Sequence, residues 1–198
     1  MTLDRLRPLA DRTMEPFVGV ATRLGLTPDA VSVVAFLLAV GAAITFFGGG
    51  RWYLLGAVLV FANGWLDLLD GRLARELGSA SPAGDVLDHV LDRYADVVIL
   101  AGLSAGIGRF GLGFAAVTGV LLTSYLGTQA EAVGLERVYG GLLGRADRLA
   151  LVGVAVVLEP FVGSVLSLSP VGWLLVVFAV VGHVTAIQRF VVTRRALT

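Results

Sequence analysis

The sequence predicts an all-α integral membrane protein with six transmembrane helices, an N-terminal amphipathic helix at the membrane interface, and both termini in the cytoplasm. Three observations predict this fold class. The chain is 57% hydrophobic and only 15% charged, whereas soluble domains carry roughly 25% charged residues. Apolar segments of about 20 residues, the length that spans a bilayer core, recur along it. Its arginines also gather on one side of these segments.

The expected elements make one membrane domain over residues 1–198, with a juxtamembrane helix over 1–25 and a six-helix bundle over 26–198. The first segment mixes leucines with charged residues, which is typical of an interfacial helix, and we expect Pro8 and Pro16 to interrupt it. Thr27 and Pro28 then provide an N-cap and a first helical residue. The expected transmembrane segments are approximately residues 30–47, 52–70, 84–107, 110–132, 149–168 and 171–192.

The orientation follows from the fifteen basic residues, all of which are arginines. With both termini on one side of the membrane, only Arg51 and Arg109 fall on the other side, and the remaining thirteen share the side of the termini. Cytoplasmic loops carry an excess of basic residues, so we expect a multi-pass plasma membrane protein with cytoplasmic termini. The thirteen are Arg5, Arg7, Arg12, Arg23, Arg72, Arg75, Arg93, Arg137, Arg145, Arg148, Arg189, Arg194 and Arg195.

Four aspartates interrupt the apolar sequence within 26 residues, on the cytoplasmic side. A carboxylate at the centre of a membrane helix costs on the order of 2.5–3.5 kcal/mol, so four of them need partners. Asp67 and Asp70 are three apart, and Asp88 and Asp92 are four apart, so each pair lies on one helix face. Because the link between the two helices is short, we expect them to be antiparallel neighbours with all four carboxylates at a similar depth.

An all-oxygen site of this kind suits Mg²⁺ or Mn²⁺ rather than zinc. Two such ions could bind both the attacking and the leaving oxygen of a phosphoryl transfer. Gly71 allows a close approach of substrate, and the guanidinium of Arg75, about one turn further on, is suited to phosphate oxygens. Residues 78–84 are expected to form a tight turn that borders a nucleotide. The net charge of zero gives no electrostatic support for a nucleic acid partner.

Two other interpretations of the aspartates remain open at this point. Carboxylates at helix ends are often solvated interface residues. Alternatively, intramembrane carboxylates mark ion pathways, so the protein could be a cation or proton transporter. A pathway needs polar groups through the whole bilayer, whereas these acids cluster at one face. A metal-dependent phosphotransferase is therefore favoured over a transporter.

The spacing D-x2-D-G-x2-A-R-x8-G-x3-D-x3-D resembles the signature of the CDP-alcohol phosphotransferase family. All eight fixed positions of this signature are present, and the six-span topology extends the resemblance over nearly the whole chain. The eight are Asp67, Asp70, Gly71, Ala74, Arg75, Gly84, Asp88 and Asp92.

The resemblance implies phospholipid synthesis in which a CDP-linked lipid, CDP-diacylglycerol or CDP-archaeol, transfers its phospho-substituent to an alcohol and releases CMP. Metal ligands would be Asp67, Asp70 and Asp88, together with Asp92, which is also the expected general base. The donor site would contain Gly71, Ala74, Arg75 and Gly84. Members of the family are commonly homodimers, so a homodimer is expected.

The acceptor is predicted from three further pieces that resemble the phosphatidylinositol-phosphate and archaetidylinositol-phosphate synthase branch, namely residues 124–131, residues 144–149 and Gln188-Arg189. Arg145, Arg148 and Arg189 would converge on the cytoplasmic side as a phosphate site, although Arg145 and Arg148 could also be topological anchors. That branch tends to carry Lys and Arg where this chain has Gly127 and Gln129. Inositol phosphate is favoured, and glycerol phosphate is the alternative.

Overall fold

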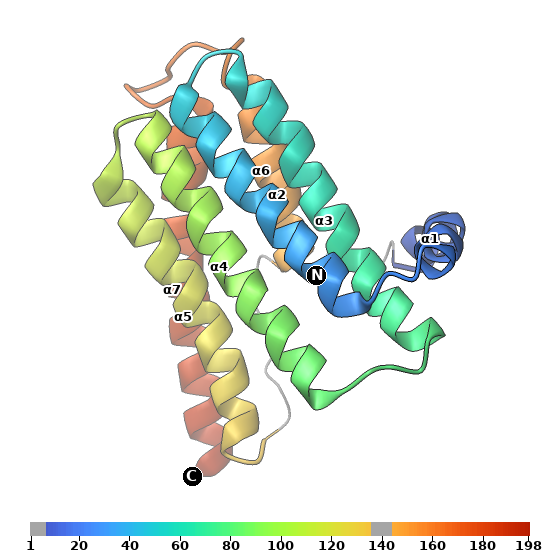
Figure 1. Ribbon diagram of the computed structural model, residues 1–198. Coiled ribbons are helices and arrows are strands. Elements are labelled where there is room, and N and C mark those ends of the chain that lie inside the picture. Colours follow the sequence, from blue (N-terminus) through green and yellow to red (C-terminus); the bar gives the residue numbers. More distant parts are fainter. Residues whose placement is uncertain (1–6, 136–143) are drawn as a thin grey trace.

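The computed structural model describes residues 7–135 and 144–198, which are helical throughout their elements and contain no strand. The N-terminal helix is seen nearly end-on at one side, and the helices that follow it lie roughly side by side (Figure 1). The all-α prediction is therefore confirmed. The helices are α1 (Arg7–Arg23), α2 (Pro28–Gly48), α3 (Trp52–Glu76), α4 (Pro82–Gly106), α5 (Phe110–Ala132), α6 (Arg145–Leu158) and α7 (Pro170–Leu197).

Three helices begin with the same local arrangement, a hydroxyl N-cap followed by proline. The side chains of Thr27, Ser81 and Ser169 accept hydrogen bonds from the backbone N–H groups three residues further on, at 3.2, 3.1 and 3.3 Å. Each cap satisfies a donor that the first turn leaves without an intrahelical partner, and the proline after it has no N–H to satisfy. These short signals fix the starts of α2, α4 and α7.

Four of the described helices, α2, α3, α5 and α7, are long and apolar enough to cross a membrane. Helix α4 has 25 residues but contains five charged residues between positions 85 and 96. Helix α6 has 14 residues, which is about 21 Å of helix against a bilayer core of about 30 Å. Each of the six predicted segments contains a helix, but among the described residues only four of these helices are both long enough and apolar enough to span a membrane.

The prediction of a fifth helix over 149–168 is wrong in its second half. Helix α6 ends at Leu158, because the proline at position 160 cannot continue the backbone hydrogen bonds. The carboxylate of Glu159 instead accepts a hydrogen bond from Val171 N–H at 2.8 Å, at the start of α7. The prediction that Pro16 interrupts the first helix is also wrong: α1 runs through it, held to α3 by Met14 and Val18.

Helix α2 lies between α3 and α4 and packs against both, while α5 packs on α7 and α3 packs on α6 (Figure 1). The main core includes Phe46, Leu103 and Phe178. Within the described residues, the backbones of α3 and α4 do not approach each other closely. The prediction that these two helices are neighbours therefore fails for their backbones, because α2 lies between them.

Glycine makes the contact between α2 and α4 possible. A Cβ added to Gly102 would lie 2.6 Å from the Cα and the carbonyl oxygen of Ala43. Because both are backbone atoms, the two helices would have to separate. We therefore expect Gly102→Ala to lower the free energy of unfolding by about 1–3 kcal/mol, the usual cost of overpacking, measured as a fall in thermal unfolding midpoint in detergent.

The matched control is Gly153→Ala in α6, where an added Cβ meets nothing within 4 Å. There the substitution removes only the helix penalty of glycine, so stability should be unchanged or rise by up to about 1 kcal/mol. Equal midpoints for the two variants would contradict the close approach of α2 and α4 at Gly102.

Candidate metal and phosphate site

Three carboxylates from two helices meet near one end of the bundle. Asp67 and Asp70 come from α3 and Asp88 comes from α4, and one oxygen from each lies within 4.8 Å of the others. Asp70 is buried, while Asp67 and Asp88 are half-buried. The i, i+3 spacing predicted that Asp67 and Asp70 share a face of α3. Asp88 reaches the same place from α4, which packs on α2 as α3 does. Three like charges this close repel one another strongly unless a cation neutralises them.

Asp92 lines the same small cavity as the three, with a volume of about 10 Å³. It is not one of the three whose oxygens lie within 4.8 Å of one another. Its Oδ2 is 3.8 Å from Nη2 of Arg93. Asp92 therefore stands beside the close group rather than within it.

Sequence reasoning did not find two polar residues at this cavity. The hydroxyl of Ser32, on α2, donates a 2.6 Å hydrogen bond to Oδ2 of Asp70. Asn63 is 1% exposed and donates to the carbonyl of Ala35, and its Oδ1 has no partner among the described residues. Asn63 could have been found, since it stands one helical turn before Asp67. Ser32 could not, because its role depends on α2 lying between α3 and α4.

The donor set fits a divalent cation of the Mg²⁺ or Mn²⁺ class. All the candidate ligand atoms are carboxylate oxygens, which such hard cations prefer. In an octahedral site with metal–oxygen bonds of 2.0–2.1 Å, two ligand oxygens lie about 2.9 Å apart when adjacent and about 4.2 Å apart when opposite. The three carboxylate oxygens, which lie within 4.8 Å of one another, would therefore have to draw closer together to share one ion.

The residues predicted for the donor side lie at the end of α3 and the start of α4. Arg75 is exposed, and its Nη1 lies 3.6 Å from the position that a Cβ on Gly71 would occupy. A Cβ on Gly84 would lie 3.3 Å from Oδ1 of Asp29, so a larger residue there would press on the start of α2. Ala74 is half-buried on the same last turns of α3. The guanidinium of Arg75 is therefore accessible to solvent and lies beside Gly71, which has no side chain to block a ligand.

Two of the arginines predicted for the acceptor are buried and hydrogen-bonded. Arg148 donates through Nη2 to Oδ2 of Asp96 at 3.1 Å, and its Nε has no partner among the described residues. Arg189 donates through Nη1 to the carbonyl of Thr123 at 2.7 Å. Thr123 and Arg148 also line one cavity of about 10 Å³. The side chain of Arg145 lies outside the described residues.

Asp96 joins this region to the aspartates. Besides Arg148, it contacts Nη1 of Arg93 at 3.4 Å, and Arg93 also donates to the hydroxyl of Ser124 on α5. A continuous set of charges thus runs from Asp92 through Arg93 and Asp96 to Arg148. Arg93 and Asp96 lie three residues apart on α4, so their ion pair joins successive turns of one helix.

A profile of CDP-alcohol phosphatidyltransferases matches residues 25–141. The archaetidylinositol phosphate synthase of Methanothermobacter thermautotrophicus is 32% identical over 195 residues, which cover 96% of this chain and 92% of that protein. The phosphatidylinositol phosphate synthase of Mycolicibacterium smegmatis is 37% identical over 184 residues, which cover 88% of this chain and 80% of that protein. The chain belongs to the CDP-alcohol phosphatidyltransferase family.

Solved structures of the Mycobacterium tuberculosis phosphatidylinositol phosphate synthase resemble this CDP-alcohol phosphatidyltransferase. The form with CDP-DAG bound gives a TM-score of 0.80 at 30% identity, covering 92% of this chain and 94% of that one. The form in complex with manganese and citrate gives a TM-score of 0.79 at 28% identity, covering 91% and 88%. The family uses a CDP-alcohol donor and an alcohol acceptor, and a divalent cation suits the aspartate group described above.

Ser32 provides a test of the site that leaves all four aspartates in place. Without its hydroxyl, Asp70 loses a buried hydrogen bond that fixes its orientation. Removing such a support of a metal ligand typically costs 10–100-fold in affinity. We expect Ser32→Ala to weaken Mn²⁺ binding by about tenfold or more, measured by electron paramagnetic resonance of free Mn²⁺.

The control is Ser104→Ala, a buried serine on α4 that donates only to the carbonyl of Ala101 on its own helix. Its Mn²⁺ affinity should match that of the unaltered protein. Identical affinities for the two variants would show that the contact between Ser32 and Asp70 does not support the site.

Proposed function

We propose that this protein transfers a phosphatidyl or archaetidyl group from a CDP-linked lipid to the hydroxyl of a phosphorylated polyol, with inositol phosphate as the favoured acceptor, and releases CMP. The observation that carries the proposal is the close group of Asp67, Asp70 and Asp88 in a chain of this family. The names of its relatives, which are inositol phosphate lipid synthases, support the choice of acceptor.

In the proposed reaction, the acceptor hydroxyl attacks the phosphorus that carries the lipid, and the bond from that phosphorus to the bridging oxygen of the pyrophosphate breaks. Two Mg²⁺ or Mn²⁺ ions, held by Asp67, Asp70, Asp88 and Asp92, would supply charge neutralisation at the phosphates. Asp92 takes the proton of the acceptor hydroxyl, a role supported by its place beside the close group. The accessible guanidinium of Arg75 binds the pyrophosphate of the donor, whose cytidine end lies along Gly71, Ala74 and Gly84.

The acceptor phosphate is proposed to bind between α5, α6 and α7, at Arg148 and Arg189 together with Arg145. The Nε of Arg148, for which the described residues offer no acceptor, supports this placement, since a buried donor without an acceptor is costly. Binding would draw Arg148 from Asp96 and Arg189 from the carbonyl of Thr123. Glycerol phosphate is kept as the second acceptor, because Gly127 and Gln129 supply no positive charge on α5.

We also propose the membrane placement that the arginines predict: one domain with six crossings in the plasma membrane, both termini and the aspartates at the cytoplasmic face, and α1 along that surface. Exposed apolar side chains of α1, among them Phe17 and Val20, support its place at the interface. Two of the arginines used, Arg5 and Arg137, lie outside the described residues. The protein is expected to act as a homodimer.

The test is CMP release by the purified full-length protein with Mg²⁺ or Mn²⁺. Donors are CDP-diacylglycerol and CDP-archaeol, and acceptors are inositol phosphate, glycerol phosphate and free inositol. We expect release with inositol phosphate at a kcat/KM at least tenfold above that with glycerol phosphate. The reverse order would assign the alternative acceptor, and no release with any acceptor would overturn the proposal.

The separate position of Asp92 predicts a division of roles. Asp92→Asn keeps the size and one oxygen of the side chain but removes the base, so turnover should fall at least a thousandfold while Mn²⁺ binding is partly retained. Asp88→Ala removes one of the three close oxygens, so both turnover and Mn²⁺ binding should be lost. Equal loss of Mn²⁺ binding in the two variants would refute this division.

The acceptor site predicts a selective kinetic effect at Arg189. We expect Arg189→Gln to raise KM for inositol phosphate at least tenfold and to change KM for the CDP-lipid less than threefold, because a charged hydrogen bond to phosphate is lost. The control is Arg194→Gln, an exposed arginine near the end of the same helix. An unchanged acceptor KM in a variant that unfolds at the normal temperature would remove Arg189 from the site.

A further inference from the structure

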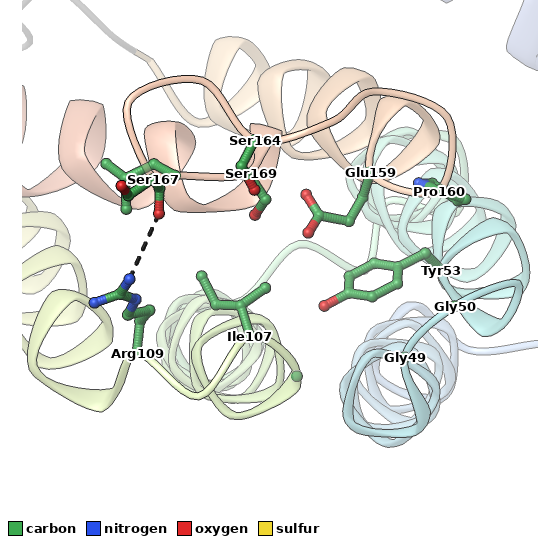
Figure 2. Close-up of a pocket in the computed structure, with 12 residues that line it drawn as sticks. Gly49, Gly50, Tyr53, Ile107, Arg109, Glu159, Pro160, Ser164, Ser167 and Ser169 are labelled. Atoms are coloured by element: carbon green, nitrogen blue, oxygen red, sulfur yellow. Dashed lines mark hydrogen bonds between the residues drawn. The ribbon is translucent and has the colours of Figure 1, made fainter.

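A cavity of about 390 Å³ lies at the end of the bundle away from the aspartates (Figure 2). Its walls come from the turn between α2 and α3, the end of α4 with Arg109, and residues 159–169 between α6 and α7. Tyr53, which lines it, stands 17 positions before Asp70 on the same helix. At 1.5 Å per residue this is about 25 Å of helix, so the cavity is separate from the aspartate cluster.

The buried hydroxyl of Tyr53 points into this cavity. Tyr53 is 3% exposed, and its phenolic oxygen has no hydrogen bond among the described residues. Its ring is fixed by stacking on Phe46, with ring centroids 5.6 Å apart. Figure 2 shows the hydroxyl and the carboxylate of Glu159 directed into the same space. Because a buried hydroxyl without a hydrogen bond is costly, a polar occupant of the cavity would be stabilised by bonding to the Tyr53 hydroxyl.

Two opposite charges face the cavity from different walls. The carboxylate of Glu159 accepts a hydrogen bond from Val171 N–H at 2.8 Å, at the start of α7. Arg109 lies across the cavity, where its Nη2 reaches the carbonyl of Ser167 at 3.5 Å (Figure 2). Among the described residues no carboxylate pairs with Arg109. The lining is thus neutral overall but strongly dipolar.

The wall that carries Ser167 is a turn held by hydrogen bonds. Leu166 and Ser167 have φ angles of 51° and 65°, which are rare for residues other than glycine. Two backbone hydrogen bonds between Val165 and Leu168 close this turn, and Trp173 Nε1 donates to the carbonyl of Val165 at 3.0 Å. The strained turn therefore holds the Ser167 carbonyl toward Arg109.

The surroundings of the cavity favour an occupant from the bilayer. Phe161 and Leu166, on the segment that forms its wall, are 71% and 81% exposed. Trp52 and Trp173, beside the cavity at the starts of α3 and α7, are also exposed, as is typical of aromatic residues at a membrane interface. A ligand that enters here would meet apolar side chains at the rim and a dipolar lining within.

We propose that this cavity binds the headgroup of a zwitterionic phospholipid that carries a phosphate and a primary ammonium, in the leaflet opposite the aspartates. The phosphate is held by Arg109, the ammonium by Glu159, and the Tyr53 hydroxyl donates to a phosphate oxygen. Separated opposite charges favour a dipolar ligand over an anion, because an anion would meet Glu159 unshielded. A soluble phosphodiester such as glycerophosphoethanolamine presents the same chemistry without acyl chains.

The test is native mass spectrometry of the full-length protein in detergent with added phosphatidylethanolamine or phosphatidylglycerol. We expect one phosphatidylethanolamine bound per chain, with at least fivefold weaker retention of phosphatidylglycerol. Competition by glycerophosphoethanolamine would assign recognition to the headgroup alone, and its failure to compete would assign the site to the intact lipid. Equal retention of both lipids, or of neither, would overturn the proposal.

Variants locate the binding in the cavity. Arg109→Gln and Tyr53→Phe should each lower retention of phosphatidylethanolamine about tenfold, and the latter keeps the ring stack. Glu159→Gln still accepts from Val171 N–H but should abolish the preference over phosphatidylglycerol. Arg51→Gln, at an exposed arginine outside the cavity lining, should have no effect. Retention unchanged in Arg109→Gln would overturn the proposal, and because CMP release is not the readout, the outcome is independent of the proposed reaction.

Discussion

The constraint on which the structure depends is the repulsion among three carboxylates whose oxygens lie within 4.8 Å of one another. In a bundle of apolar helices this arrangement is costly unless a cation or a proton compensates the charges, because water screens them less than at an open surface. The helices around it are placed accordingly: α2 lies between α3 and α4 and supplies the Ser32 hydroxyl to Asp70. The fold thus holds apart the backbones of the two helices whose side chains must meet.

Charge also connects this site to the other half of the bundle. Asp96 is buried and is shared by Arg93 and Arg148, which come from α4 and α6, and Arg93 reaches Ser124 on α5. Removing Asp96 would leave two arginines without their common partner. The resulting loss of stability would exceed the net stabilisation that the ion pairs provide, because buried charge would be left uncompensated. The position of Arg148 is therefore set by the same helix that carries Asp88 and Asp92. A phosphate bound at Arg148 would compete with a contact that α4 provides.

Much of this site could be predicted because the spacing of residues along a helix determines which side chains share a face. Asp67 with Asp70 share a face by the i, i+3 rule, and the hydroxyl–proline caps mark where α2, α4 and α7 start. The features that the sequence did not predict are contacts between helices that are distant in the chain. The place of α2 between α3 and α4, and hence the role of Ser32, has no local signal. The early end of α6 had one, in Glu159-Pro160, but hydropathy outweighed it in setting the segment from 149 to 168.

The two ends of α3 illustrate different arrangements of charge. Near its end, like charges are gathered, which favours a cation; near its start, the charges of Arg109 and Glu159 are held apart, which favours a dipolar ligand. Between them the helices are in tight contact, since a Cβ on Gly56 would overlap the ring of Phe46 and one on Gly102 the backbone of Ala43. Because interiors packed this closely leave little room for movement, α2, α3 and α4 hold the carboxylates of the aspartate group at one end of the bundle.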